Sequence, residues 1–331
     1  MRHGGNVWDC ETPEKWLDFS ANLRPEGTPD WVMDVMQQAL ADARYYPDRA
    51  MKAARRGLAA YAGMSEECIL PTAGGAQAID LVLGDGTGRV CIQQPTFIEY
   101  SERAMAHGRK VCTKMNDIRP GDTVVRCNPN NPTGAVMTRG DMLTFADQVR
   151  ARDAELMVDE AFIDFCEENS VRRDVCEGLT VVGSLTKTLC IPGVRLGYVC
   201  ASPERIARLE KQMLTWSLNV LANAVAAALP EHLDEMRADV RKNLFRVRKM
   251  QTLLCEAGVT PMPTRANFLL CDFGEDTTPL VSYLKEQHIL VRTCASFGLG
   301  SNWLRLAVKT DEENARLVSA IAAWKEKNHA R

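Results

Sequence analysis

The sequence has little that would tie the protein to a membrane or to nucleic acid. It carries 40 Lys and Arg against 43 Asp and Glu, a formal net charge of −3 over 331 residues. It therefore lacks the basic excess that binds nucleic-acid backbones or anionic lipid surfaces. Its most apolar run, 220–229, falls well short of the roughly 20 residues that span a bilayer. Residues 1–6 contain no apolar segment of the kind that a secretory signal needs.

Closely spaced cysteine pairs are also missing, although the chain has twelve cysteines. No two of them lie within four residues of each other, and most, such as Cys91, Cys127 and Cys271, stand in apolar runs. Zinc sites need closely spaced ligands, and stable disulfides belong to oxidising compartments. The sequence therefore predicts reduced, buried thiols in a cytoplasmic protein without a bound metal.

Short apolar segments alternate with helix-like segments through the first two thirds of the chain. The expected helices are 30–43, 51–62, 101–107 and 141–151, and the expected strands are 89–93, 111–113, 123–127, 156–158, 181–184 and 196–200. Apolar strands that alternate with helices predict an α/β fold, with a mostly parallel sheet that helices cover on both faces.

The pattern changes after Pro203. Helices are expected at 204–214, 222–257 (interrupted at Pro230), 278–287 and 312–327, with strands at 267–272, 289–293 and 304–308. This arrangement predicts a smaller α+β domain. We expect three parts: an N-terminal arm over 1–30, a large domain over 31–222 and a small C-terminal domain over 223–331.

The strongest chemical signal follows the expected strand that ends at Ser184. Lys187 comes three residues later, Thr186 adds a second hydroxyl, and Arg195 adds a guanidinium. A lysine can form a Schiff base with a carbonyl cofactor, and hydroxyls with a guanidinium can hold its phosphate. Taken alone, Ser-x-x-Lys also occurs in penicillin-interacting serine enzymes, and Lys187 could equally be an ordinary exposed lysine.

A glycine-rich turn at 72–77, TAGGAQ, precedes the apolar run 78–83. A turn of this kind that opens a helix leaves backbone amides and a positive dipole end free for a phosphate, although many glycine pairs only make turns. Two polar motifs follow strands: 128–134 reads NPNNPTG, and Asp159 comes directly after 156–158. Ligands of parallel sheets bind beyond the carboxyl ends of the strands, so these groups are expected near Lys187.

In order and spacing, these motifs resemble fold-type I enzymes that depend on pyridoxal 5'-phosphate (PLP), and the resemblance covers nearly the whole chain. It implies that Lys187 carries the cofactor covalently. It also implies that Asp159 binds the ring nitrogen and Asn131 the phenolic oxygen of the ring. Phe97 stands where the family places an aromatic side chain against the ring.

The resemblance also implies how the cofactor phosphate is held. Its expected ligands are the backbone amides of Gly75 and Ala76 and the side chains of Ser184, Thr186 and Arg195. A homodimer with shared active sites is implied as well, because Tyr46 matches the family tyrosine that reaches the phosphate of the neighbouring subunit.

Two groups of the family are most similar, the histidinol-phosphate aminotransferases and the threonine-phosphate decarboxylases of cobalamin biosynthesis. Segments resembling the decarboxylases are 3–6 (HGGN), 18–22 (DFSAN), 216–219 (WSLN) and 304–309 (LRLAVK). Phe162 also stands where the aminotransferases usually carry a tyrosine.

The resemblance implies decarboxylation of a small phosphorylated amino acid, with L-threonine O-3-phosphate as the expected substrate. Arg305 would bind the α-carboxylate. His3, Asn22 and Arg292 would bind the substrate phosphate, and Arg24, where relatives carry Asn, is a further candidate. Three alternatives stay open: transamination with the same cofactor residues, decarboxylation of serine phosphate, and a PLP-binding regulator, which would usually carry a DNA-binding segment ahead of this domain.

Overall fold

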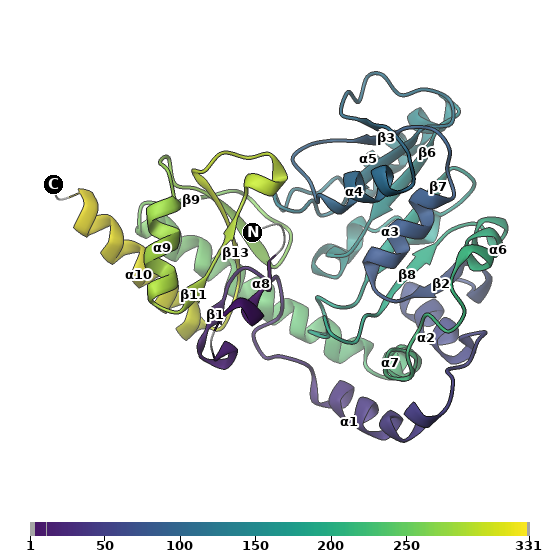
Figure 1. Ribbon diagram of the computed structural model, residues 1–331, viewed down its shortest axis with the longest axis horizontal. Helices are drawn as coiled ribbons and strands as arrows, with labels where there is room; N and C mark the ends of the chain where they lie inside the picture. Colours follow the sequence, from purple (N-terminus) through teal and green to yellow (C-terminus); the bar gives the residue numbers. More distant parts are fainter. Residues whose placement is uncertain (1–3, 11, 330–331) are drawn as a thin grey trace.

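Two β-sheets organise the computed structural model, which describes residues 4–10 and 12–329 (Figure 1). The larger sheet has the strand order β2-β8-β7-β6-β5-β3-β4. Its strands are β2 (Ile69–Thr72), β3 (Val90–Ile92), β4 (Val111–Cys112), β5 (Thr123–Cys127), β6 (Glu155–Asp159), β7 (Leu179–Ser184) and β8 (Gly197–Cys200). Both antiparallel pairs among these strands involve β8, which pairs with β2 and β7, and the other pairs are parallel. The expected α/β fold with a mostly parallel sheet is confirmed.

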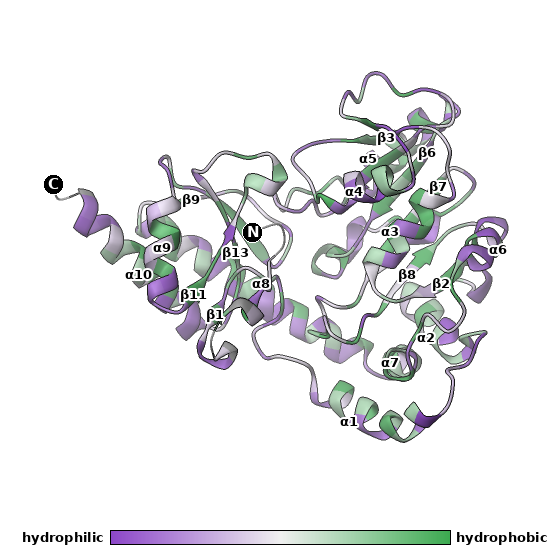
Figure 2. Cartoon of the chain, viewed as in Figure 1, coloured by the Kyte–Doolittle hydropathy of each residue, from purple (hydrophilic) through white to green (hydrophobic). Residues whose placement is uncertain are grey.

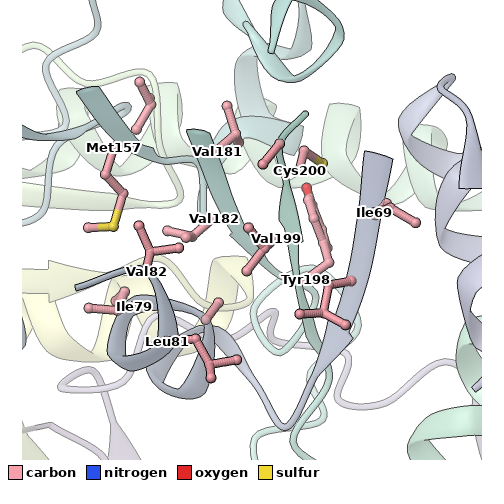
Figure 3. Close-up of a cluster of buried hydrophobic side chains, with 14 of the residues drawn as sticks. Ile69, Ile79, Leu81, Val82, Met157, Val181, Val182, Tyr198, Val199 and Cys200 are labelled. Carbon is pink, nitrogen blue, oxygen red and sulfur yellow. The ribbon is translucent and has the colours of Figure 1, made fainter. Parts of the chain in front are cut away.

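The strands of this sheet are buried on both faces, which explains why they read as continuous apolar runs. Helix α3 (Gly75–Gly84) packs on β7 and β8, and α5 (Arg139–Arg150) packs on β6. Side chains of α3, among them Ile79 and Val82, lie against Met157, Val182 and Val199 of the sheet (Figure 3).

The remaining helices of the first two thirds of the chain are α1 (Asp30–Ala39), α2 (Lys52–Ala62), α4 (Glu99–Ala106), α6 (Pro203–Gln212) and α7 (Val220–Ala228). Gly63 ends α2 in the left-handed conformation, with φ 70°, which suits a residue without a Cβ atom. The helix expected to run to residue 43 is shorter, since a 3₁₀ segment (Leu40–Arg44) follows α1.

A smaller antiparallel sheet lies in the C-terminal part, with the order β12-β13-β10-β9. Its strands are β9 (Thr260–Pro261), β10 (Phe268–Asp272), β12 (Arg292–Thr293) and β13 (Trp303–Ala307), and its helices are α8 (Leu233–Glu256), α9 (Thr278–Glu286) and α10 (Asp311–His329). The interruption expected at Pro230 is confirmed, since a 3₁₀ turn (Leu229–Glu231) separates α7 from α8.

The prediction of a single strand over 289–293 is wrong. Its first half, β11 (Ile289–Leu290), pairs in parallel with β1 (Leu17–Asp18) of the N-terminal segment. Its second half, β12, pairs with β13 instead. The chain changes partner at Val291 because the N-terminal segment supplies a neighbour for β11, and no local apolar pattern encodes that distant partner.

Two large clusters of buried hydrophobic side chains form the core. The first contains residues between Trp31 and Met236, and the second joins Phe19 to residues between Val247 and Trp324. Helix α8 contributes to both clusters and so runs through both halves of the molecule (Figure 1). Hydrophobic residues concentrate on the strands of the larger sheet, whereas α6 is mainly hydrophilic (Figure 2). Phe19 thus anchors the N-terminal segment to the C-terminal part.

All twelve cysteines are free, and Cys91, Cys200 and Cys271 are among the buried ones. No helix in the described part of the chain is long and apolar enough to cross a membrane.

Candidate active site

A pocket of about 400 Å³ lies at the carboxyl ends of β5, β6 and β7. The ends of these strands are held in register, with Cys127 opposite Asp159 and Asp159 opposite Val182. The N-terminal segment contributes Asn22 to the pocket, and β13 of the smaller sheet contributes Arg305. The two sheets and the N-terminal segment therefore build the pocket together.

Lys187 lines this pocket from the loop after β7. Burial lowers its pKa to about 8, and the charges of Arg305 and Arg195 act in the same direction. A lysine with a lowered pKa has a larger fraction of neutral amine near neutral pH, which is the form that attacks a carbonyl.

Asp159 ends β6 and is buried. One carboxylate oxygen accepts a hydrogen bond from the Tyr100 hydroxyl at 2.6 Å, and the other accepts from the backbone N–H of Ala161 at 2.9 Å. Burial raises the pKa of Asp159, while both hydrogen bonds and the charge of Lys187 oppose that rise. The pocket thus holds a desolvated carboxylate that donors stabilise in its charged form.

Arg305 is buried and bridges two walls of the pocket. Its Nη1 donates to Asn131 Oδ1 at 2.7 Å, and its Nη2 donates to the carbonyl oxygen of Ser20 at 2.6 Å. Its Nε is buried and has no hydrogen-bond partner among the described residues. Because Asn131 accepts through its oxygen, its amide NH₂ is the group that remains available to an acceptor in the pocket.

A cluster of donors lies where β2 turns into α3. Gly74 takes φ 83°, and the first amides of α3, at Gly75 and Ala76, have no acceptor in the described part of the chain. Opposite them, the hydroxyls of Ser184 and Thr186 lie 2.8 Å apart. The backbone amides and hydroxyls form a seat for an anion such as phosphate.

The family model for aminotransferase class I and II matches residues 14–321 of this sequence. The chain belongs to the aminotransferase class I and II family. A threonine-phosphate decarboxylase of Salmonella typhimurium is 31% identical to it, over 96% of this chain and 95% of that protein. A histidinol-phosphate aminotransferase of Mycobacterium bovis is also 31% identical, over 93% of this chain and 87% of that protein.

Among solved structures, the L-threonine-O-3-phosphate decarboxylase of Porphyromonas gingivalis aligns with a TM-score of 0.85 and 25% identity. The alignment covers 94% of this chain and 99% of that one. The resemblance inferred from the motifs is therefore confirmed at the level of the aminotransferase class I and II fold, and the cofactor is PLP.

The residues of the pocket fit the PLP of aminotransferase class I and II enzymes. A Cβ atom built on Gly74 would lie 2.7 Å from the guanidinium of Arg195, and one on Gly75 would lie 3.2 Å from Cβ of Ser184. The glycines thus keep the backbone close to the cation and the hydroxyls, which leaves a cradle for the phosphate. Lys187 and Asp159 lie in the same pocket, as an amine and a carboxylate suited to the aldehyde and the ring nitrogen.

The pocket brings together most residues that the sequence singled out. They are Asn22, Gly75, Ala76, Phe97, Asn131, Asp159, Phe162, Ser184, Thr186, Lys187, Arg195 and Arg305. Asn22 is buried, and its side-chain oxygen has no hydrogen-bond partner among the described residues. It therefore adds a polar group to the wall nearest the N-terminal segment.

Arg292 does not line the pocket, although it is buried close to Arg305. Its Nη2 donates to the hydroxyl of Ser296 at 2.6 Å, and its guanidinium lies 5.2 Å from the ring centre of Phe297. Of the two arginines expected to face the cleft, Arg305 lines this pocket, whereas Arg292 lies beside Arg305 and does not line it. His3 lies outside the described residues.

Two further candidates lie away from the pocket. Tyr46 is 78% exposed and stacks on Trp216, with ring centres 4.4 Å apart. Arg24 forms an ion pair with Asp239 of α8 at 2.6 Å and a looser one with Glu26. Arg24 therefore fixes the N-terminal segment to α8 and is not a wall of the pocket.

The sequence did not reveal Tyr100, Ser20 or Cys127 as pocket residues. Tyr100 is the fully buried aromatic side chain of α4, whose other residues are mostly polar or small. A single aromatic residue in a polar helix was therefore the one sequence feature that could have indicated a buried role for Tyr100. The contribution of Ser20, a carbonyl oxygen facing Arg305, depends on tertiary structure that no side-chain motif reports.

Proposed function

We propose that this protein is a PLP-dependent decarboxylase that converts L-threonine O-3-phosphate into (R)-1-aminopropan-2-yl phosphate for cobalamin biosynthesis. The observation that carries the proposal is the buried arginine pair, Arg305 and Arg292, on neighbouring strands of the smaller sheet. A phosphorylated amino acid has a carboxylate and a phosphate, and each suits the guanidinium fork.

Two observations favour decarboxylation over transamination. The relatives from Salmonella typhimurium and Porphyromonas gingivalis are named as threonine-phosphate decarboxylases and match nearly the full length. In the pocket, Phe162 contributes a ring without a hydroxyl and packs edge-on against Phe268, with ring centres 5.1 Å apart. It therefore supplies no side-chain hydrogen bond to the phenolic oxygen of the cofactor, which leaves Asn131 as the proposed donor.

We assign the cofactor contacts by position. Lys187 would be the covalent attachment point, Asp159 would pair with the ring nitrogen, and Phe97 would stack on the ring. The phosphate is assigned to the first amides of α3 and to the side chains of Ser184, Thr186 and Arg195. When bound, PLP supplies an electron-accepting ring that takes up the electron pair released when a bond to the substrate Cα breaks.

Arg305 orients the substrate through the α-carboxylate. A guanidinium has five N–H donors, and Asn131 and Ser20 take one each. The buried Nε and one N–H on each Nη remain for the carboxylate. By holding the carboxylate, Arg305 would determine which bond to the substrate Cα is oriented for cleavage. Asn22, which lines the pocket, is assigned to the phosphate end, and so is Arg292, which lies outside the lining as the register partner of Arg305.

Lys187 then acts as the proton donor. In decarboxylation the bond from Cα to the carboxylate carbon breaks, CO₂ leaves, and Cα receives one proton in its place. Lys187 has a pKa lowered to about 8 by burial and by its two arginine neighbours, so its Nζ can both carry and release a proton near neutral pH.

We further propose that the enzyme is a cytoplasmic homodimer in which each active site takes Tyr46 from the other subunit. An exposed tyrosine stacked on a half-exposed tryptophan is an unusual surface for a monomer. Tyr46 does not line the pocket of its own chain, which agrees with a role in a second copy.

The experiment that tests this function compares substrates directly. Purified holoenzyme is incubated with threonine phosphate, serine phosphate and histidinol phosphate, each with and without 2-oxoglutarate. CO₂ release from threonine phosphate without a keto acid is expected. A requirement for 2-oxoglutarate would instead favour the aminotransferase alternative that the Mycobacterium bovis relative suggests. Serine phosphate lacks one methyl group of threonine phosphate. In an apolar pocket one such group changes the free energy of transition-state binding by about 1–3 kcal/mol, so serine phosphate is expected to react more slowly.

A further inference from the structure

We propose that Tyr100 is a positioning residue for the cofactor, which holds Asp159 in its charged form and supports the ring of Phe97. The proposal rests on the assigned pairing of Asp159 with the ring nitrogen of PLP. It does not depend on whether the reaction is decarboxylation or transamination.

The geometry places Tyr100 behind both cofactor contacts. Its side chain is fully buried on α4, and its hydroxyl donates to Asp159 Oδ2 at 2.6 Å. This distance is typical of a hydrogen bond between a hydroxyl and a charged carboxylate. Because the backbone N–H of Ala161 donates to Oδ1, each carboxylate oxygen has one donor and keeps a lone pair for the cofactor.

The electrostatic need for such a donor is clear. A carboxyl buried without donors holds its proton, and a neutral Asp159 could not stabilise a protonated ring nitrogen. The titratable groups that face Asp159 are Tyr100 from α4, Cys127 from β5 and Lys187 from the loop after β7. Burial raises the pKa of the Tyr100 hydroxyl and of the Cys127 thiol, so both stay protonated and Tyr100 remains a donor.

The ring of Tyr100 has a second contact. It meets the ring of Phe97 edge-on, with centres 5.7 Å apart and planes at 86°. Phe97 lines the pocket, where it is assigned to stack on the cofactor. One buried side chain therefore couples the residue that stacks on the ring to the residue that holds its nitrogen.

The test uses holoenzyme loaded with PLP labelled with ¹⁵N in the ring. Tyr100→Phe removes one oxygen and keeps the contact with Phe97, so the fold should persist. The ¹⁵N resonance is expected to move towards that of a neutral pyridine. The ring nitrogen is expected to lose its proton at a lower pH than in the wild type. The value of kcat is expected to fall about ten- to a hundredfold, with KM little changed.

A matched control is Tyr61→Phe, because the Tyr61 hydroxyl also donates to a carboxylate, Asp164 Oδ1 at 2.5 Å, but neither residue lines the pocket. This variant is expected to leave the ¹⁵N resonance unchanged. If it shifts the resonance as Tyr100→Phe does, the effect is general packing and the proposal is overturned.

The variant Asp159→Asn distinguishes the role of Tyr100 from the pairing of Asp159 with the ring nitrogen, on which that role rests. If it moves the ¹⁵N resonance and Tyr100→Phe does not, the role of Tyr100 is rejected while the assignment of Asp159 stands. If neither variant moves it, the pairing of Asp159 with the ring nitrogen is rejected together with the role of Tyr100.

Discussion

Arg292 and Arg305 are register partners on the antiparallel strands β12 and β13, so their side chains leave the small sheet on the same face. Both guanidinium groups lie near the ring of Phe297, at 5.2 and 5.8 Å from its centre. Burial, followed by the charge of Arg292, lowers the pKa of Arg305. Two buried cations side by side are unfavourable until anions approach them, which is the situation that a carboxylate and a phosphate relieve.

This pair leads to a prediction about the two ends of the substrate. Arg292→Lys is expected to weaken binding of threonine phosphate much more than binding of threonine, because it disturbs only the phosphate end. Arg305→Lys is expected to weaken both by roughly 1.5–3 kcal/mol, since a charged hydrogen-bonded pair is disturbed. Binding is measured by the change in visible absorbance when each amino acid is added to the holoenzyme. Equal losses for both ligands in Arg292→Lys would remove this arginine as the phosphate contact.

The assignment of Asp159 predicts a large loss of rate without loss of structure. Asp159→Asn keeps the shape of the side chain but removes the charge that stabilises a protonated ring nitrogen. We expect kcat to fall by orders of magnitude, with circular dichroism and the midpoint of thermal unfolding close to the wild-type values. Near-normal turnover would show that the electron-accepting ring is held in another way.

The proposed shared site predicts complementation between two damaged proteins. In the proposed dimer, Tyr46→Phe would impair the contact to the partner's cofactor, and Lys187→Ala would remove the attachment point. A mixed dimer places both defects in one site and leaves the other intact, so activity after mixing is expected to exceed the sum of the two parents. Activity that stays at that sum, with mixed dimers demonstrated by mass spectrometry, would mean that each site is built from one chain.

The lowered pKa of Lys187 predicts how the stability of the cofactor-free protein depends on pH. Burial takes the pKa from 10.5 to about 8, so the unfolded chain binds more protons than the folded one between these values. Stability attributable to Lys187 therefore rises with pH across this window. Lys187→Met should be more stable than wild type below pH 8, by at most about 3–4 kcal/mol, and this difference should shrink towards pH 10.5.

Urea unfolding at several pH values measures this difference. The exposed Lys110 offers a matched control, because Lys110→Met leaves the buried site untouched. A stability difference for Lys187→Met that is the same at pH 7 and pH 10 would contradict a buried, neutralised amine.

Much of the fold could be predicted from local patterns. Strand β5 was predicted with its observed bounds, and the turn at Gly74 was recognised. A strand buried on both faces reads as an apolar run, and a turn that needs a positive φ favours glycine, so both features are visible in the local sequence. The division of 289–293 into two strands could not be foreseen, since it depends on pairing with residues 17–18, more than 270 positions away.

The residues of the candidate site also fall into those that the sequence could predict and those that it could not. The residues whose chemistry is carried by a motif, such as Lys187 and Asp159, were found from their spacing and lie in one pocket. Tyr100 and the carbonyl oxygen of Ser20 were missed because they act on other pocket residues, Asp159 and Arg305. The sequence also could not show that Arg24 forms an ion pair with Asp239, because that contact depends on how α8 packs beside the N-terminal segment.

The most direct test of the proposed function follows the hydrogen on the substrate Cα. L-threonine O-3-phosphate carrying deuterium at Cα is incubated with the holoenzyme in ordinary water, and the product is analysed by mass spectrometry. Decarboxylation breaks only the bond to the carboxylate, so aminopropanol phosphate should retain the deuterium and gain one proton from solvent. Loss of the deuterium to water, with formation of a keto product and a requirement for a keto acid as amino acceptor in turnover, would contradict the proposal and indicate transamination.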